Sequence, residues 1–254
     1  MRRMYVFLIA WLACVFVVYF FGSGDQTFLL YASDIISPTS AFLPAFYSVT
    51  LVRRYGFSRK DRFTRLWVYT AAGLLLWLLG ELTWSVYGLF LGVSEPYPSV
   101  ADVFWIAGYL PLVVALLAYM APFKGALSLK SVLLAVGVAL LADVVVFSVL
   151  IGPVFGPSAD PATRLVDFAY PLLDMLLLGL AIAGMLLFLP GRISRFWVWL
   201  NVGMIFIAIA DVLFSYTSAL ETYYTGHPLE LFYFLGDAAI LLGLYEHTRA
   251  LHTD

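Results

Sequence analysis

Acidic residues occur inside the long apolar segments of this 254-residue sequence, where charged side chains are costly. A carboxylate at the centre of a membrane helix costs about 2.5–3.5 kcal/mol to insert, so such residues usually face a bundle interior or a wet cavity. Carboxylates placed in this way suit a hard cation, a proton or an amine-bearing ligand. The acids that carry this expectation are Asp34, Glu81, Asp102, Asp143, Asp167, Asp174, Asp211, Glu230 and Asp237, and all of them except Asp34 and Asp143 are candidate ligand-binding residues.

Aromatic side chains share helical faces with these acids. Asp167, Tyr170 and Asp174 follow the i, i+3, i+7 spacing of one helix face, and Trp84 lies three positions after Glu81. Convergent stripes of this kind predict an outward-facing cavity of acidic and aromatic character. The other candidate ligand-binding residues are Trp84, Trp105, Tyr109, Tyr170 and Arg164, with Arg164 either a surface partner of Asp167 or the counterion of the cavity.

Each acid also has a purely structural interpretation. Asp102 and Glu230, and to a lesser degree Asp167, lie near expected helix starts, where an acid can cap free amide groups. The deeper acids Asp174 and Asp211 cannot be caps, and their structural alternative is a hydrogen bond between helices. No catalytic residue, metal site or cofactor is assigned.

The composition places these residues in a membrane. The sequence is 63% hydrophobic and 12% charged, against about 45–50% and 25% in soluble domains. Eight runs are long enough to span a bilayer, which takes about 20 helical residues. We therefore expect one all-α polytopic domain over residues 1–254, with spans near 4–22, 28–52, 66–89, 101–122, 131–152, 165–189, 196–217 and 229–248. Asp34, Pro38 and Pro44 interrupt the second run, whose first half is expected to be irregular or kinked.

The basic residues indicate the orientation. With both termini in the cytoplasm, 13 of the 14 lysines and arginines fall on the cytoplasmic side, and Arg164 alone lies outside. We therefore expect a multi-pass protein of the cell membrane whose surroundings are the lipid bilayer. The basic segment 53–65 follows from this orientation rule and does not indicate a nucleic-acid site.

Three acidic positions recur at nearly one period. The matched pairs are separated by 133, 130 and 128 positions and are Asp34 with Asp167, Glu81 with Asp211, and Asp102 with Glu230. This recurrence predicts two four-helix repeats, about 1–123 and about 131–250. A unit with an even number of spans re-enters on the same side, so the repeats are expected to be parallel.

Three parts of the sequence also resemble a known family. The motifs of a multi-span membrane region in bacterial signalling proteins are similar to Pro96-Tyr-Pro-Ser-Val-Ala-Asp102-Val-Phe-Trp-Ile-Ala-Gly108-Tyr, to Ala169-Tyr-Pro-Leu-Leu-Asp174, and to Ala210-Asp211 with Gly226-His-Pro-Leu-Glu. That region precedes diguanylate cyclase, phosphodiesterase or histidine kinase modules. The resemblance covers about residues 66–245 and implies a sensory input domain with Asp102, Tyr170, Pro171, Asp174 and Asp211 as pattern residues. Because this sequence carries no such output module, a sensor role would require a separate cytoplasmic signalling partner.

The leading interpretation is therefore a sensory or ligand-binding membrane module for a small cationic or amine ligand from the outer side. A small proton- or cation-coupled transporter is the first alternative, because duplicated halves and intramembrane acids are common there. An intramembrane lipid-modifying enzyme with paired carboxylates is a second alternative, and enzymatic activity is the less favoured reading.

The orientation is directly testable. Cysteines placed at Ser94 and Ser158 are expected to react with an impermeant maleimide added to intact cells, and a cysteine at Ser58 is not, because of the 13-to-1 division of basic residues. Labelling at position 58 in intact cells would contradict the orientation.

Overall fold

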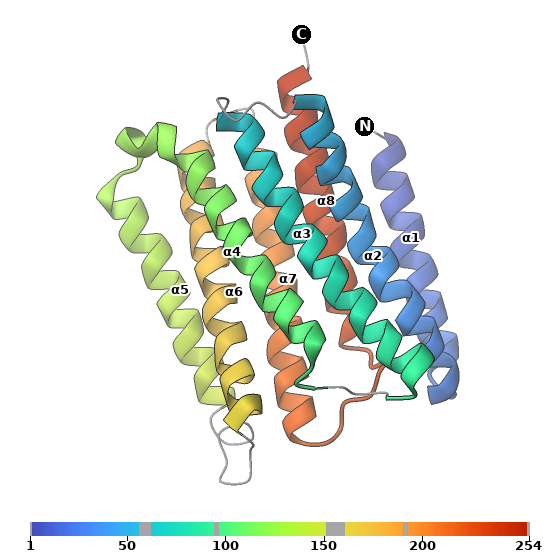
Figure 1. The fold of residues 1–254 in the computed structure, drawn as a ribbon. Coiled ribbons are helices and arrows are strands. Elements are labelled where there is room, and N and C mark those ends of the chain that lie inside the picture. Colours follow the sequence, from blue (N-terminus) through green and yellow to red (C-terminus); the bar gives the residue numbers. More distant parts are fainter. Residues whose placement is uncertain are drawn as a thin grey trace.

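The chain folds into a bundle of long helices (Figure 1). The computed structural model describes residues 2–55, 62–93, 97–150, 161–189, 191 and 193–252. Ser58, Ser94 and Ser158 lie outside these ranges. The helices are α1 (Arg2–Gly22), α2 (Gln26–Tyr55), α3 (Arg62–Val86), α4 (Val100–Met120), α5 (Leu129–Leu150), α6 (Pro161–Phe188), α7 (Ser194–Ala219) and α8 (Glu230–His252), with a π-helical turn η1 (Tyr87–Leu91) and a 3₁₀ turn η2 (Ala121–Ala126).

The predicted all-α class and the eight helices are confirmed. Among the described residues, seven helices, α1 to α7, are long and apolar enough to cross a membrane. The eighth, α8, packs against α1, α2 and α7. Every residue of α8 from Ala238 to Thr248 except Tyr245 is buried. A helix enclosed in this way presents little surface to lipid, which accounts for its more polar sequence.

Six helices form a closed ring. Going round the ring, α2 packs on α3, α3 on α4, α4 on α6, α6 on α7, α7 on α8, and α8 on α2. The remaining two helices lie outside it: α1 packs on α2 and α8, and α5 packs mainly on α6. In Figure 1, α1 and α5 occupy opposite edges of the bundle, and both chain ends lie at the same end of it.

The expectation of an irregular first half of the second span is wrong, and the alternative of a kink stays a prediction. The α2 helix runs without a break from Gln26 to Tyr55 through Pro38 and Pro44. Proline removes one helical hydrogen bond, but hydroxyl side chains and packed neighbours make this tolerable in membrane-type helices. Thr39 Oγ1 donates to the Ile35 carbonyl oxygen at 2.6 Å, one position after the carbonyl that Pro38 leaves without its usual donor.

Pairs of glycines let the helices of each half cross closely. A Cβ built on Gly108 of α4 would lie 3.0 Å from the Gly73 carbonyl oxygen of α3, and one on Gly203 of α7 would lie 3.1 Å from the Gly236 carbonyl oxygen of α8. Gly73 and Gly203 are 130 positions apart, and Gly108 and Gly236 are 128 apart. These are the spacings of the acidic pairs Glu81/Asp211 and Asp102/Glu230. Small residues at such crossings allow backbones to approach and pack in membrane helices.

The side chains over these glycines correspond as well. Trp77 lies over Gly108, and Ile207, which is 130 positions later, lies over Gly236. Leu112 lies over Gly73, and Ile240, which is 128 positions later, lies over Gly203. The α3–α4 and α7–α8 crossings therefore use equivalent positions for both backbone and side chains.

Glycine at these crossings is required by space. Gly108→Ala and Gly236→Ala are each expected to destabilise the protein by about 1–3 kcal/mol, because the added methyl overpacks a closed crossing. The melting temperature in detergent micelles measures this effect. Gly137→Ala in α5 is the matched control, because nothing lies within 4 Å of a Cβ at that position. A fall in stability for Gly137→Ala equal to that of the other two would contradict the account.

Candidate ligand-binding site

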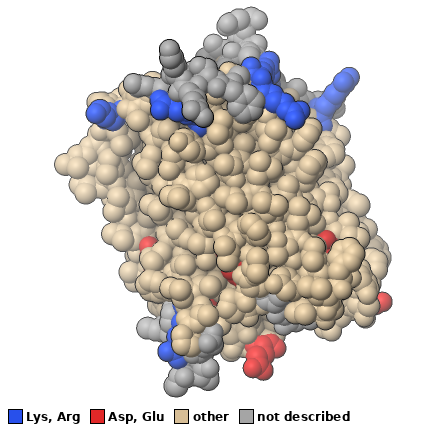
Figure 2. Space-filling model, in the orientation of Figure 1, with Lys and Arg blue, Asp and Glu red and all other residues tan. Residues whose placement is uncertain are grey.

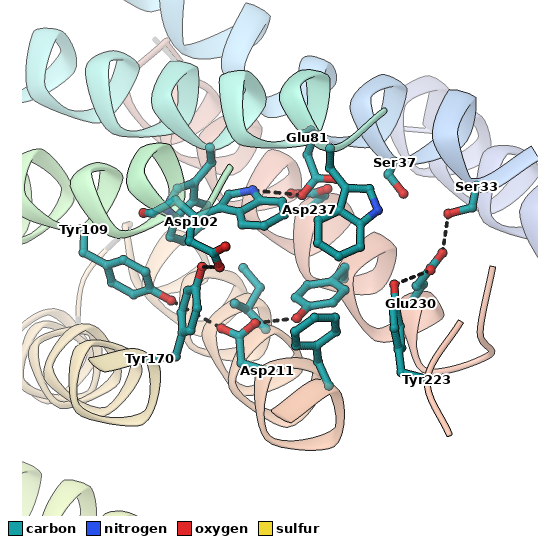
Figure 3. Close-up of a pocket in the computed structure, with 17 residues that line it drawn as sticks. Ser33, Ser37, Glu81, Asp102, Tyr109, Tyr170, Asp211, Tyr223, Glu230 and Asp237 are labelled. Atoms are coloured by element: carbon teal, nitrogen blue, oxygen red, sulfur yellow. Dashed lines mark hydrogen bonds between the residues drawn. The ribbon is translucent and has the colours of Figure 1, made fainter. Parts of the chain in front are cut away.

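The six-helix ring encloses a cavity of about 110 Å³ (Figure 3). That volume accommodates several water molecules, since one needs about 10–15 Å³ of such space. All six ring helices contribute to the wall, in the half of the bundle away from the chain ends. The lining residues are Ser33, Ser37, Ala41, Trp77, Glu81, Trp84, Asp102, Trp105, Tyr109, Tyr170, Ile207, Asp211, Phe214, Tyr223, Glu230, Tyr233 and Asp237.

Asp102 has both a capping role and a place in the wall. It is the third residue of a capping box at the start of α4, and its Oδ2 accepts a hydrogen bond from the Ser99 backbone N–H at 2.6 Å. Its Oδ1 accepts from the Tyr170 hydroxyl of α6 at 2.9 Å. The capping interpretation is therefore correct for Asp102, and the same carboxylate also joins α4 to α6.

Glu230 holds together three helices and a loop. At the start of α8 it accepts hydrogen bonds from Tyr19 of α1 and Ser33 of α2, both at 2.5 Å. It also accepts from the Tyr223 hydroxyl at 2.9 Å and the Gly226 backbone N–H at 2.7 Å. Four donors on one buried carboxylate replace the hydration that it loses.

Asp174 and Asp211 share one tyrosine. The Tyr109 hydroxyl donates to Asp174 Oδ1 at 2.5 Å and lies 3.4 Å from Asp211 Oδ2. Asp211 also accepts a hydrogen bond from Tyr233 of α8. Asp174 Oδ2 is buried and has no hydrogen-bond partner among the described residues. Two carboxylates this close repel each other when both are charged.

Glu81 and Asp237 keep free acceptor capacity toward the cavity. Glu81 Oε1 accepts from the Trp105 indole N–H at 3.1 Å. No hydrogen bond to the Asp237 carboxylate is found within the described parts of the chain. Figure 3 shows these two carboxylates on the same wall of the cavity. The Trp84 and Trp105 rings beside them lie 5.8 Å apart, centroid to centroid.

Positive charge is missing from the wall. None of the lining residues that the structure describes is a lysine, arginine or histidine. His227 lies in the adjacent α7–α8 loop, where burial lowers its pKa and favours the neutral ring. In the same loop, burial and the nearby charge of Glu230 raise the pKa of Tyr223, which keeps its hydroxyl a hydrogen-bond donor. Within the described ranges, no three His, Cys, Asp or Glu side chains group as a metal site.

Nine of the twelve predicted ligand-binding residues line the cavity. They are Glu81, Trp84, Asp102, Trp105, Tyr109, Tyr170, Asp211, Glu230 and Asp237. Asp174 lies behind the wall and touches the cavity through Tyr109. Asp167 accepts from the Tyr97 hydroxyl at 2.5 Å. Asp167 and Arg164 do not line the cavity.

The capping interpretation of Asp167 is wrong. The α6 helix begins at Pro161, four residues before the expected start, so Asp167 lies beyond its first turn. The carboxylate is buried and bonds instead to Tyr97, in the connection before α4. Burial and the Asp167 charge raise the pKa of Tyr97, so its hydroxyl remains a donor.

Several wall residues were not predicted as site residues. They are Ser33, Ser37, Ala41, Trp77, Ile207, Phe214, Tyr223 and Tyr233. Helical spacing could have predicted Tyr233, because it lies three positions after Glu230 and four before Asp237 on one helix face. Tyr223 lies in a loop, where no periodicity marks a buried side.

Asp34 differs from its proposed equivalent Asp167. It is buried, and neither of its carboxylate oxygens has a hydrogen-bond partner among the described residues. It packs against Gly88 in the π-helical turn η1, where a Cβ would lie 2.9 Å from Asp34 Cγ. Sequence reasoning relates Asp34 to Asp167, but only Asp167 has a tyrosine donor.

Comparison with known proteins adds no relative: no family model, no curated protein and no solved structure matches the chain. The resemblance to bacterial signalling regions therefore rests on the quoted motifs and remains a prediction.

Removing the Tyr109 hydroxyl tests how much its hydrogen bonds to Asp174 and Asp211 contribute to stability. Tyr109→Phe is expected to lower the free energy of unfolding by about 1–3 kcal/mol, because it leaves buried acceptors without a donor. Asp174→Asn is expected to be at least as stable as the parent, because it removes the repulsion with Asp211 and keeps an acceptor for Tyr109.

Thermal unfolding in detergent measures both variants. Tyr69→Phe is the control. Tyr69 is a half-exposed residue of α3, and its hydroxyl makes no hydrogen bond within the described parts of the chain. A Tyr109→Phe protein as stable as Tyr69→Phe would contradict the network.

Proposed function

We propose that the chain is a ligand-binding membrane module that takes a small organic cation into the acidic and aromatic cavity. One observation carries the proposal: five carboxylates and eight aromatic side chains line the cavity, and none of its described lining residues is basic. Most of these acids already have hydroxyl donors. Glu81 and Asp237 retain unused oxygen atoms that face the space a ligand would fill.

An organic ammonium ion fits this chemistry. An organic ammonium ion loses hydration free energy when it leaves water. Nearby carboxylates offset this loss only when they lie close to the ion and are not already paired with another cation. Trp84, Trp105 and Tyr233 supply aromatic faces, which attract cations more strongly when water is excluded. A cavity of about 110 Å³ favours a ligand of a few non-hydrogen atoms.

We further infer that all eight helices span the membrane, with both termini in the cytoplasm. The support comes from the surface: lysine and arginine side chains gather at the end of the bundle that holds both chain ends (Figure 2). The start of α1 with Arg3, the end of α2 with Arg53 and Arg54, and η2 with Lys124 all lie at this end, whereas α6 begins near Arg164 at the opposite end (Figure 1). The positive-inside rule then orients the cavity toward the outer side.

We also infer that the two halves are parallel repeats. The supporting observation is the pair of glycine crossings, whose backbone and side-chain contacts match at the spacings of the acidic pairs. The positions of α1 and α5 outside the ring agree with this relation. A repeat axis along the membrane normal would pass through the ring.

A sensory role is supported by the course of α8. Its first two turns carry Glu230, Tyr233 and Asp237 into the cavity, and its last turns reach the end that holds the termini. There, Glu246 accepts from Tyr5 of α1 at 3.0 Å and lies 3.6 Å from the guanidinium group of Arg195 in α7. A displacement of α8 by a ligand would change these contacts, which a cytoplasmic partner could read.

One observation favours transport as a second candidate function. A second, apolar cavity of about 40 Å³ lies within the ring, nearer the end of the bundle that holds the chain ends. Its lining includes Trp67, Leu116 and Tyr119. Trp77 lines both this cavity and the outer one, so it separates the two spaces.

Choline is a direct probe of the proposed site, because its quaternary ammonium group is a strong cation–π partner. Choline is expected to change the tryptophan fluorescence of the detergent-purified protein in a saturable manner. Glu81→Gln and Asp237→Asn should each weaken its binding about tenfold or more, since each removes a charge facing the cation. Glu221→Gln, which alters an exposed acid of the α7–α8 turn, should leave binding unchanged.

The uncharged isostere 3,3-dimethylbutanol is expected to produce no saturable change. Equal responses to choline and this alcohol, or equal binding by Glu81→Gln and Glu221→Gln, would refute the proposed function. Saturable uptake of choline by proteoliposomes would assign transport instead of sensing.

A further inference from the structure

A second and larger space lies outside the ring. It measures about 630 Å³ and is a groove between α4, α5 and α6. Its walls are mainly leucine, valine, alanine and methionine side chains. Two charged residues contribute to them, Lys124 in η2 and Asp143 in α5. This groove shares no residue with the acidic cavity.

The groove exists because α5 does not pack as α1 does. The peripheral helix α1 contacts two ring helices, α2 and α8. Its equivalent in the second half, α5, packs along α6 and touches α7, and the groove separates it from α4. Large apolar side chains are left uncovered there: Leu117 of α4, Val136 and Leu140 of α5, and Leu172 and Leu176 of α6 are all more than two-fifths exposed.

We propose that this groove binds one acyl chain of an anionic glycerophospholipid, with the phosphate beside Lys124. The walls between Lys124 and Asp143 are apolar and match a hydrocarbon chain. Lys124 is exposed and belongs to η2, which lies at the end of the bundle that holds both chain ends (Figure 1). Basic residues between membrane helices on the cytoplasmic side are suited to anionic headgroups.

The two charges determine which way the lipid lies. The α5 residues that line the groove run from Val132 to Asp143, which corresponds to about 17 Å of helix. That length suits an extended acyl chain running from the headgroup level into the hydrocarbon core, which is about 30 Å thick. Asp143 marks the deep end, where its carboxyl group would repel a phosphate. Only the Lys124 end can therefore accept the anionic headgroup.

The proposal does not depend on a ligand in the acidic cavity, and its test is separate. Native mass spectrometry is performed on the full-length protein after exchange against equimolar phosphatidylglycerol and phosphatidylcholine with the same acyl chains. We expect one bound lipid to survive mild activation, with phosphatidylglycerol preferred. Lys124→Ala should reduce that preference about fivefold, as expected for one lysine at an anionic surface.

A bulky substitution tests the position of the chain. Val136→Trp fills the groove from α5 and should abolish the retained lipid. Val138→Trp is the matched control, because Val138 is 40% exposed on the same helix but does not line the groove. Arg53→Ala, which removes an exposed cation from the same end of the molecule, is the control for Lys124→Ala.

Three results would overturn the proposal. They are equal retention of the two lipids by the parent protein, equal lipid loss by Val136→Trp and Val138→Trp, and equal loss of preference by Lys124→Ala and Arg53→Ala. Retention of oleate in preference to phosphatidylglycerol would also overturn it, because a fatty acid would then be the occupant.

Discussion

A carboxylate inside an apolar bundle is stabilised by hydrogen-bond donors from the protein, because lipid supplies none. This constraint organises the cavity end of the structure. Tyr170 and Ser99 satisfy Asp102, four donors satisfy Glu230, and Tyr97 satisfies Asp167. In most of these hydrogen bonds the donor and the carboxylate belong to different helices or loops. The polar contacts therefore also define which helices are neighbours.

The same constraint separates structural acids from available ones. Asp102 and Glu230 have their acceptor sites largely occupied, and removing either would leave several donors without partners. Glu81 and Asp237 face the cavity with acceptor capacity unused, beside the Trp84 and Trp105 rings. A protein that only needed stability would gain by replacing such groups with apolar ones. We therefore propose that a ligand contacts Glu81 and Asp237.

Much of the architecture could be predicted from the sequence, because the hydropathy of a segment and the helical spacing of its polar residues are local properties. All eight helices lie where apolar runs indicate, and the face of α6 that carries Asp167, Tyr170, Pro171 and Asp174 is buried as its spacing implies. The closed ring and the groove beside α5 could not be predicted, since they depend on which helices pack together. The continuity of α2 was missed because Pro38 and Pro44 break helices in water more readily than in a packed bundle. Loop residues such as Tyr223 were missed because no periodic signal marks them.

Locating a bound cation tests the central claim most directly. Arsenocholine carries an arsenic atom whose anomalous scattering marks its position in crystals of the protein soaked with this compound. The account predicts one strong anomalous peak inside the ring, between the carboxylates of Glu81 and Asp237 and the indole faces of Trp84 and Trp105. An absence of any peak in this cavity under saturating arsenocholine, or a peak only elsewhere on the molecule, would contradict it.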